Sequence, residues 1–293
     1  MKIVITGAKG QLGTQLINII KSGKSEIGSI DEKYLNSEII GIDIEDLDIS
    51  NLDEVIDFIC KEKPDIIINP AAYTNVDACE SNEDLAYKVN SLGARNLAIA
   101  AEKVGAKLIH VSTDYVFEGN GTKPYKEYDI PNPVGVYGKT KYLGEQFVRE
   151  FSSKHFIVRT AWLYGYNGGN FVKTIMKAAK ERGKLQVVDD QRGNPTNAED
   201  LAHHLLKIAL SDEYGIYHCT GEGECSWYDF ACKIVEMSNI ECTVDPCTSE
   251  QYKRAAKRPE YSSLDNMMLR CTVGNEMRSW EAALEEFVEK VKF

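Results

Sequence analysis

The sequence predicts an α/β protein in which a doubly wound parallel sheet is followed by a smaller mixed α/β domain. Three observations predict this fold class. Nearly continuous apolar runs recur through the first 165 residues, helical stretches separate them, and a glycine-rich turn follows the first run. Strands that are buried on both faces of a parallel sheet have such runs, and strand–helix alternation is typical of their crossover connections.

The first part of the chain, residues 1–165, is expected to form the sheet domain. We predict its strands at residues 2–7, 38–43, 65–71, 107–113 and 156–162. Helices are predicted between them, near residues 11–22, 51–63, 81–104 and 137–151. Each strand therefore leads into a helix, as the crossover connections of a parallel sheet require.

The second part, residues 166–293, is expected to form mainly the smaller domain. A strand, a polar loop and a helix are predicted over residues 184–210, with Thr196 or Asn197 as the helix N-cap. The helix near 197–210 is also a candidate to return to the first domain. A strand at 215–221, a helix at 226–239 and a terminal helix that begins near residue 279 complete this part.

The composition excludes several classes of protein. The 34 basic and 45 acidic residues give a net charge of −11, so nucleic acid and an anionic membrane surface are not expected as partners. No apolar run reaches the roughly 18 residues of a membrane span, and the start lacks a secretory apolar core, so we expect a cytoplasmic protein. The eight cysteines form no C-x-x-C pair and no zinc-spaced cluster, and we interpret them as small buried hydrophobic residues.

A glycine-rich turn, "ITGAKGQLG", follows the first strand and opens the first helix. Gly7 permits the tight turn, Gly10 lets the backbone approach a pyrophosphate, and Gly13 lets the helix pack close to the sheet. The free amides at the helix N-terminus attract an anion. The turn therefore predicts a Rossmann-type dinucleotide site, with a purely structural turn as the alternative.

The end of the second strand indicates which dinucleotide is bound. Asp43 can accept hydrogen bonds from both hydroxyls of an adenosine ribose, and its charge would repel a 2′-phosphate. We therefore expect NADH, with NADPH as the alternative because the positive charge of Lys9 acts in the opposite direction. Asp48 and Ile49 could flank the adenine, or their segment could cap the next helix.

The stretch "PVGVYGKTKYLGE" places Tyr137 and Lys141 four residues apart on a predicted helix, so their side chains share one face. An ammonium group favours phenolate, and we expect it to lower the pKa of Tyr137 toward the working range of a general acid. Thr113, between Ser112 and Asp114, ends the fourth strand at the edge where open parallel sheets bind ligands. Thr113, Tyr137 and Lys141 are therefore the candidate catalytic residues, with a turn cap as the alternative role for Thr113.

The glycine turn, the threonine after the fourth strand and the Y-x-x-x-K pair make the chain resemble the extended short-chain dehydrogenase/reductases. Six segments together resemble one branch of that family, the dTDP-4-dehydrorhamnose reductases. They are "NPAAYTNVDACE", "STDYVFEG", "YGKTKYLGE", "RTAWLYG", "DDQRGNPT" and "KRPEYSSLD". These segments extend over nearly the whole chain, and their joint occurrence is far more specific than any one of them.

The resemblance implies a role for each matching position on the catalytic and cofactor side. Tyr137 would protonate the C4 oxygen of a dTDP-linked deoxy keto-sugar while the reduced nicotinamide delivers hydride to C4. Lys141 would bind the nicotinamide ribose, and Thr113 would hydrogen-bond the same sugar oxygen. The residues that would contact the pyrophosphate or line the cofactor are Gly10, Gln11, Leu12, Ala71, Ala72 and Tyr73.

On the substrate side, the resemblance implies two groups of residues. The deoxysugar pocket would be shaped by Val76, Asp114, Tyr115 and Trp162, and the nucleotide would be faced by Asn170, Arg258 and Tyr261. The planar, permanently charged fork of an arginine suits a diphosphate. Simpler alternatives stay open: Trp162 could be core, Arg258 a surface charge, and Val76 and Tyr115 ordinary loop packing.

Three further positions bear on metal binding and on the family pattern: Gln15, Pro70 and the histidine pair at 203 and 204. Some members of the branch dimerise around magnesium held by glutamates, one of them just past the glycine turn, where this chain has Gln15. Glutamine is a poorer ligand for a hard cation, so we expect no metal, and a homodimer stays an open alternative. Pro70, where a small residue is more usual, removes one backbone donor at the end of the third strand. We interpret His203 and His204 as helix-surface residues rather than ligands.

The resemblance therefore implies a reductase that converts dTDP-4-dehydro-β-L-rhamnose to dTDP-β-L-rhamnose, which supplies cell-surface polysaccharide. Two alternatives stay open. One is a reductase of another nucleotide-linked 4-keto sugar. The other is a non-catalytic subunit that binds a dinucleotide and regulates a methionine adenosyltransferase, which the complete catalytic set argues against.

Overall fold

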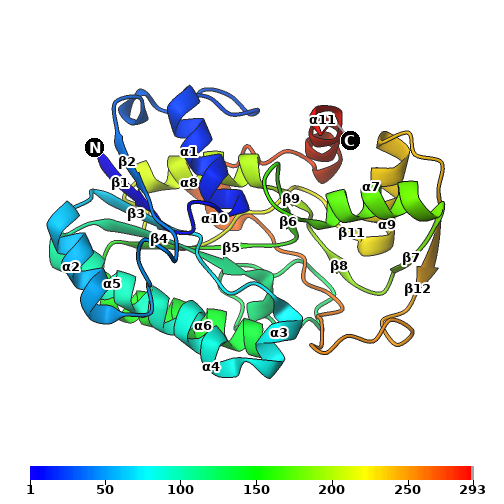
Figure 1. Ribbon diagram of the computed structural model, residues 1–293, viewed down its shortest axis with the longest axis horizontal. Helices are drawn as coiled ribbons and strands as arrows, with labels where there is room; N and C mark the ends of the chain where they lie inside the picture. The colour runs from blue at the N-terminus through cyan, green and yellow to red at the C-terminus, as the bar shows by residue number, and fades with distance from the viewer. Residues whose placement is uncertain (292–293) are drawn as a thin grey trace.

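A six-stranded parallel sheet forms the centre of the computed structural model, which describes residues 1–291 (Figure 1). Residues 292 and 293, the end of the second predicted domain, lie outside this description. The strand order is β10-β5-β4-β3-β1-β2, and every neighbouring pair is parallel. The strands are β1 (Lys2–Ile5), β2 (Glu38–Gly41), β3 (Ile66–Asn69), β4 (Lys107–Thr113), β5 (His155–Thr160) and β10 (Gly215–His218).

Helices cover both faces of this sheet (Figure 1). On one face lie α1 (Gln11–Ser22), α8 (Ala198–Leu210) and α10 (Met267–Cys271). On the other face lie α2 (Leu52–Glu62), α5 (Gly93–Val104) and α6 (Val136–Phe151). The predicted doubly wound α/β fold is therefore confirmed.

The burial of β1 explains why its sequence is apolar throughout. Ile3 and Ile5 belong to the core that includes Leu205 of α8. Val4, between them, belongs to the core on the opposite face, with Leu97 of α5. Successive side chains of a strand point to opposite faces, so a strand that is covered on both sides has no polar face.

The helix predicted over residues 81–104 is divided into four pieces: α3 (Val76–Ser81), α4 (Glu83–Tyr87), a π-helical segment (Lys88–Leu92) and α5. Asn90 accepts a hydrogen bond from the Tyr73 amide at 2.8 Å and donates to the Thr140 hydroxyl at 3.2 Å. Gly144 of α6 packs against the Asn90 carbonyl, where a Cβ atom would lie 2.4 Å from the oxygen. The helix is interrupted where an inward polar side chain holds both the loop after β3 and α6.

The second part of the chain supplies a smaller lobe of short strands and helices (Figure 1). Its strands pair as β6 (Leu163–Tyr164) with β9 (Thr196–Asn197), β7 (Lys184–Val188) with β12 (Thr243–Cys247), and β8 (Arg192–Gly193) with β11 (Cys225–Ser226). Its helices are α7 (Phe171–Arg182), α9 (Trp227–Met237) and α11 (Trp280–Lys290).

This second part also returns to the sheet. The N-cap of α8 is Asn197, whose side chain accepts from the Glu199 amide, and α8 packs against α1. The following strand, β10, pairs with β5 and becomes an edge of the main sheet. We therefore propose a domain boundary near residue 165, with residues 198–218 returning to the first domain.

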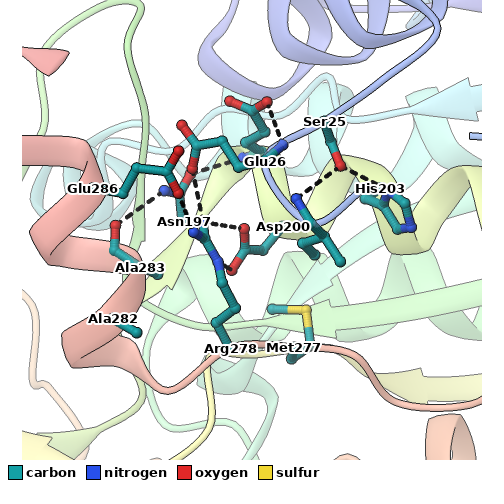
Figure 2. Close-up of polar contacts among 12 residues, drawn as sticks. Ser25, Glu26, Asn197, Asp200, His203, Met277, Arg278, Ala282, Ala283 and Glu286 are labelled. Carbon is teal, nitrogen blue, oxygen red and sulfur yellow. Dashed lines mark hydrogen bonds and ion pairs between the residues drawn. The ribbon is translucent and has the colours of Figure 1, made fainter. Parts of the chain in front are cut away.

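An ion-pair network ties the lobe to the first part of the chain (Figure 2). Glu26, in the loop after α1, accepts a hydrogen bond from Arg278 at 2.7 Å, and its side chain is only 3% exposed. Arg278 also donates to Asp200 of α8 at 2.6 and 2.9 Å and pairs with Glu286 of α11. Lys290 reaches Glu26 at 2.7 Å. Because the buried carboxylates are paired, the network joins four segments without leaving a buried charge uncompensated.

The interpretation of the paired histidines as surface residues was wrong. His203 is 8% exposed and His204 is 0% exposed. His204 Nδ1 lies 2.8 Å from the Asp200 carbonyl oxygen, and Nε2 accepts from the Glu276 amide at 3.0 Å. The segment that precedes α11 covers this side of α8, so both rings are enclosed.

Two findings bear on the expectations from composition. The interpretation of the cysteines as buried hydrophobic residues is confirmed for Cys79, Cys219, Cys225 and Cys247. It was wrong for Cys271, which is exposed, and for three that are only partly buried, Cys60, Cys232 and Cys242. Within residues 1–291, no helix combines the length and the apolar character that crossing a membrane requires.

Candidate active site

The glycine turn between β1 and α1 has the geometry that its glycines predict. Gly7 has a φ of +54°, a conformation that favours glycine. A Cβ atom on Gly13 would lie 2.2 Å from the Gly7 carbonyl oxygen, so the helix meets the turn without room for a side chain. Gly10 is the N-cap of α1, and the first turn of this fully described helix carries no acidic residue. The N-terminal amides are therefore available to an anion.

A cleft of about 880 Å³ opens at the carboxyl edge of the sheet and extends to the smaller lobe. Parallel strands end at the same edge, which brings residues far apart in sequence into one site. The three candidate catalytic residues thus share a cleft with the glycine turn. The predicted residues that line it are Gly7, Gly10, Gln11, Leu12, Gly13, Asp43, Asp48, Ile49, Ala71, Ala72, Tyr73, Val76, Thr113, Asp114, Tyr115, Tyr137, Lys141 and Trp162.

Thr113 and Tyr137 approach the cleft from β4 and α6. The Thr113 hydroxyl donates to the Asp114 carboxylate at 2.9 Å and accepts from the Tyr115 amide at 3.2 Å, so Thr113 caps a turn as well as lining the cleft. The Tyr137 ring lies edge-on to Tyr115, with the ring centroids 5.5 Å apart. Gly138 permits this approach, because a Cβ atom there would lie 2.1 Å from the Tyr115 carbonyl oxygen.

Lys141 is enclosed by the sheet, and its side chain is among the largest fully buried ones, at 2% exposure. Its amine donates to the Val111 carbonyl at 2.6 Å and lies 3.5 Å from His110 Nε2. Burial lowers the pKa of Lys141 to about 8, although the Glu145 carboxylate acts in the opposite direction. Removing an ammonium from water disfavours its charged form, which is the cause of this shift.

The expectation that the pKa of Tyr137 is lowered was wrong. Loss of solvent around the phenol raises the pKa of Tyr137 above its ordinary value, and a hydrogen bond with Thr113 offsets only part of this effect. The Lys141 amine, engaged by the Val111 carbonyl and weakened as a cation by burial, does not reverse it. Tyr137 therefore keeps its proton through neutral pH, which is the state that a proton donor needs.

Asp114 places a second titratable group beside the Thr113 hydroxyl. It is 2% exposed, and this burial raises the pKa of Asp114 to about 6. The hydrogen bond from Thr113 favours the carboxylate but does not compensate for the lost hydration, and within residues 1–291 the other carboxylate oxygen, Oδ2, has no hydrogen-bond partner. The cleft therefore contains, beside Thr113, a carboxyl group whose pKa burial raises toward the neutral range.

The opposite end of the cleft has the residues expected at an adenosine. Asp43 lies two residues beyond β2, where its carboxylate accepts from the Lys9 and Ile44 amides at 3.0 and 2.9 Å. Asp48 and Ile49 line the same end, and the capping role falls instead to Asn51, the N-cap of α2. Each of the predicted residues at this end is therefore in contact with the cleft.

Arg258 does not line the cleft but reaches one residue that does. Its guanidinium donates to the Tyr115 hydroxyl and to the Asp77 carboxylate, both at 3.0 Å. Asp77 also accepts from the Ala256 amide at 3.1 Å. Arg258 is thus not a free surface charge, because its guanidinium is held by Asp77 and by Tyr115, which lines the cleft.

The other two predicted nucleotide residues also lie outside the cleft lining. Asn170 is the N-cap of α7, and its amide donates to Gln11 at 3.1 Å, so it supports the glycine turn from behind. Tyr261 donates to Glu224 at 2.6 Å in the smaller lobe. Both residues are engaged in protein contacts, and their role toward a nucleotide stays a prediction.

Sequence reasoning missed an aromatic wall on the lobe side of the cleft. Trp227, the first residue of α9, stacks face to face on Trp162 with the ring centroids 3.5 Å apart. Phe171 packs against Trp227 at 4.4 Å. Trp162 has a φ of +47°, which is uncommon for a bulky residue, and Gly193 leaves space for its ring. Only the "SWYDF" segment, at a helix start after a polar turn, could have signalled Trp227.

The fold and the site define the class of the protein. A doubly wound parallel sheet carries a glycine turn at its first strand–helix junction, and a threonine, a tyrosine and a lysine line the same cleft. This combination places the molecule in the short-chain dehydrogenase/reductase fold.

Comparisons with known proteins define the family. A family model, the RmlD substrate binding domain, matches residues 1–293. A solved dTDP-4-dehydrorhamnose reductase from Clostridium acetobutylicum is 47% identical, with a TM-score of 0.93 and 99% of both chains covered. Another from Bacillus anthracis, solved in complex with NADP, is 44% identical, with a TM-score of 0.92 and 99% of both chains covered. The spore coat polysaccharide biosynthesis protein SpsK of Bacillus subtilis is 39% identical, covering 99% of this chain and 97% of the relative.

The chain therefore belongs to the RmlD substrate binding domain family, together with proteins named dTDP-4-dehydrorhamnose reductases. The resemblance inferred from the six sequence segments is confirmed.

Proposed function

We propose that this protein is an NAD(P)H-dependent reductase that converts dTDP-4-dehydro-β-L-rhamnose to dTDP-β-L-rhamnose. The observation that carries the proposal is the convergence of Thr113, Tyr137 and Lys141 on the cleft that contains the glycine turn. The names of the relatives support the substrate, and the polysaccharide role of one of them supports a place in cell-surface polysaccharide synthesis. The same proposal places the protein in the cytoplasm, as a monomer or a homodimer.

The residues of the cleft fit a dinucleotide. The glycine turn leaves no room for side chains where a pyrophosphate would approach, and the N-terminal amides of α1 are free to bind it. When bound, the reduced nicotinamide supplies the hydride for the C4 carbon of the sugar. After β3, the cofactor would be lined by Ala71, Ala72 and Tyr73, and Lys141 would hold the nicotinamide ribose.

The protein itself contributes a proton donor that is held in position. The neutral Tyr137 phenol would give its proton to the C4 oxygen as negative charge develops there, and the Thr113 hydroxyl would hydrogen-bond the same oxygen. Since the raised pKa of Tyr137 keeps the phenol protonated, the proton is available throughout the neutral range. Val76, Asp114, Tyr115 and Trp162 would then fix the sugar, with Arg258 near the diphosphate.

For the cofactor, we propose that NADH is preferred and NADPH is accepted. Asp43 at the adenosine end disfavours a 2′-phosphate. A hollow of about 290 Å³ borders Asp43 and is lined by Lys9 and Lys21, and Lys21 is the cation there that could meet a phosphate, because Lys9 pairs with Glu45 at 2.8 Å and Asp46 also lines the hollow. The NADP complex of a 44% identical relative supports acceptance of the phosphorylated form. We expect Asp43→Asn to weaken the preference for NADH. The ratio of kcat/KM for NADH to kcat/KM for NADPH should therefore fall.

The experiment that tests the function is a turnover assay over several nucleotide-linked 4-keto sugars with both reduced nicotinamides. The expected result is rapid oxidation of cofactor with the dTDP-linked 4-dehydrorhamnose and slow or no oxidation with the others. A different preferred keto sugar would change the substrate and keep the reaction class. Dinucleotide binding with no turnover on any sugar, together with copurification of a methionine adenosyltransferase, would replace the enzyme by a regulatory subunit.

A further inference from the structure

A row of buried polar side chains extends from the cofactor turn to Lys141. Thr6, Asn69 and His110 are each 1% exposed. The Thr6 hydroxyl donates to Asn69 Oδ1 at 2.6 Å, and Asn69 Nδ2 lies 3.0 Å from His110 Nδ1. His110 Nε2 lies 3.5 Å from the Lys141 amine. The row thus joins the residue before Gly7, which lines the cleft, to a candidate catalytic residue.

The sheet dictates this juxtaposition. The register of β3 and β4 sets Asn69 directly opposite His110. Thr6 follows β1, the neighbour of β3 on its other side, and its amide bonds to the Ile68 carbonyl. A strand residue that is polar and fully buried needs a partner for each hydrogen-bonding atom, and the row supplies them.

The charged and titratable groups around the Lys141 amine come from two elements. On α6 the group is Glu145, and on β4 it is His110. The Glu145 carboxylate is occupied by a two-point pair with Arg159, at 2.9 and 2.7 Å. The close acceptors for the amine are therefore the Val111 carbonyl and the imidazole.

A neutral imidazole can present either a lone pair or an N–H to the amine. Burial and the Lys141 amine both lower the pKa of His110, so the ring is neutral. When Lys141 is charged, it donates to Nε2, the ring proton lies on Nδ1, and Asn69 must present its oxygen to that proton. When the amine is neutral it can accept from Nε2–H, and Asn69 then presents its nitrogen to Nδ1.

We propose that His110 is a positioning residue for the reduction, whose ring proton moves between Nδ1 and Nε2 as Lys141 gains or loses its charge. The change balances with one proton: the ammonium and the Nδ1–H ring become the amine, the Nε2–H ring and one proton released to solvent. The Asn69 amide turns over in response and alters the hydrogen bond that reaches Thr6 beside the cofactor turn. An amide does not relay protons in this way, so His110 orients and holds Lys141 rather than feeding protons to it.

The role in the reduction rests on the proposed function, but its test does not require turnover. Protein labelled with ¹⁵N in its five histidines is followed by ring-nitrogen NMR from pH 6 to pH 10, and His110→Gln assigns the signal. We expect the His110 nitrogens to exchange protonated and unprotonated character with a midpoint near that of Lys141. Lys141→Met should abolish the change.

His218 is a matched internal control. It is 0% exposed, and its Nε2 lies 3.4 Å from Arg159, a cation that does not titrate in this range. Its ring signals should stay constant from pH 6 to pH 10. A flat His110 signal in the unmodified protein would overturn the proposal, and so would a His110 change that persists in Lys141→Met.

Activity then tests the role itself, provided that the unmodified protein turns over a keto sugar. In His110→Leu the ammonium loses an acceptor, so the alkaline limb of the kcat–pH profile should move about one unit toward lower pH. His110→Gln keeps an acceptor and should recover part of that shift. A role in packing alone would lower kcat equally at every pH, and that outcome would reject the positioning role even if the NMR result held.

Discussion

The two walls of the cleft are built differently. The wall that would hold the cofactor, called the cofactor wall, consists of backbone turns after β1, β2 and β3, and its residues lie between positions 6 and 74. The wall that would hold the substrate, called the substrate wall, consists of large side chains, Trp162, Phe171 and Trp227, supplied by segments that meet only in the folded lobe. The first wall is fixed by local conformation, whereas the second depends on packing between distant parts of the chain.

The largest expected effect is at Tyr137, where the two walls meet. Tyr137→Phe keeps the ring and its edge-on contact with Tyr115 but removes the proton. We expect kcat to fall by about 10²- to 10⁴-fold, since this is the usual contribution of a general acid. Steady-state kinetics with the keto sugar measures the loss, and fluorescence titration should show NADH binding retained. An unchanged kcat would exclude Tyr137 as the proton donor to the keto sugar.

The cofactor wall can be broken at Gly13. Gly13→Ala adds a Cβ atom 2.2 Å from the Gly7 carbonyl oxygen, so α1 must move away from the turn. We expect a loss of about 1–3 kcal/mol in the free energy of unfolding, together with weaker NADH binding. The control is Gly28→Ala, where nothing lies within 4 Å of the added atom. Equal stability of the two variants in urea unfolding would show that the turn is not close-packed.

This difference explains how much of the molecule could be predicted from its sequence. Continuous apolar strands and the glycine spacing act through neighbouring residues, so the sheet and the cofactor wall were predictable. The return of β10 to the main sheet was not, because a short apolar strand carries no sign of its partner. The burial of His204 was missed for the same reason: the segment that covers α8 lies about 70 residues later in the chain.

Asp114, which directly follows β4, carries an electrostatic cost in the folded state. Its pKa is raised from 3.8 to about 6 by burial, so the folded state binds the proton more tightly than the unfolded chain. Stability should therefore fall as the pH rises through the window between those values, and the cost at pH 7 is about 1–3 kcal/mol. Asp114→Asn should be more stable at pH 7 and should lose this pH dependence. Denaturant unfolding at several pH values measures both.

The control for this prediction is Asp57→Asn, a change at an exposed aspartate on α2. It removes the same charge far from the cleft and should leave the pH dependence of stability unchanged. If Asp114→Asn is less stable than the unmodified protein at pH 7, then the hydrogen bond that the Asp114 carboxylate accepts from Thr113 outweighs the cost of burying the charge.

The smallest expected effect is that of a change at Trp227, which should alter sugar binding without altering NADH binding. Trp227→Ala removes the ring that backs Trp162 while leaving the glycine turn and the adenosine end untouched. A stacked aromatic pair contributes about 0.5–1.5 kcal/mol, so we expect KM for the nucleotide sugar to rise about 2- to 10-fold. NADH binding should not change, and Trp227→Phe should restore part of the affinity because a ring still faces Trp162. Equal losses of sugar and NADH affinity would mean that the lobe supports both walls, and the division drawn here between local turns and distant side chains would not hold.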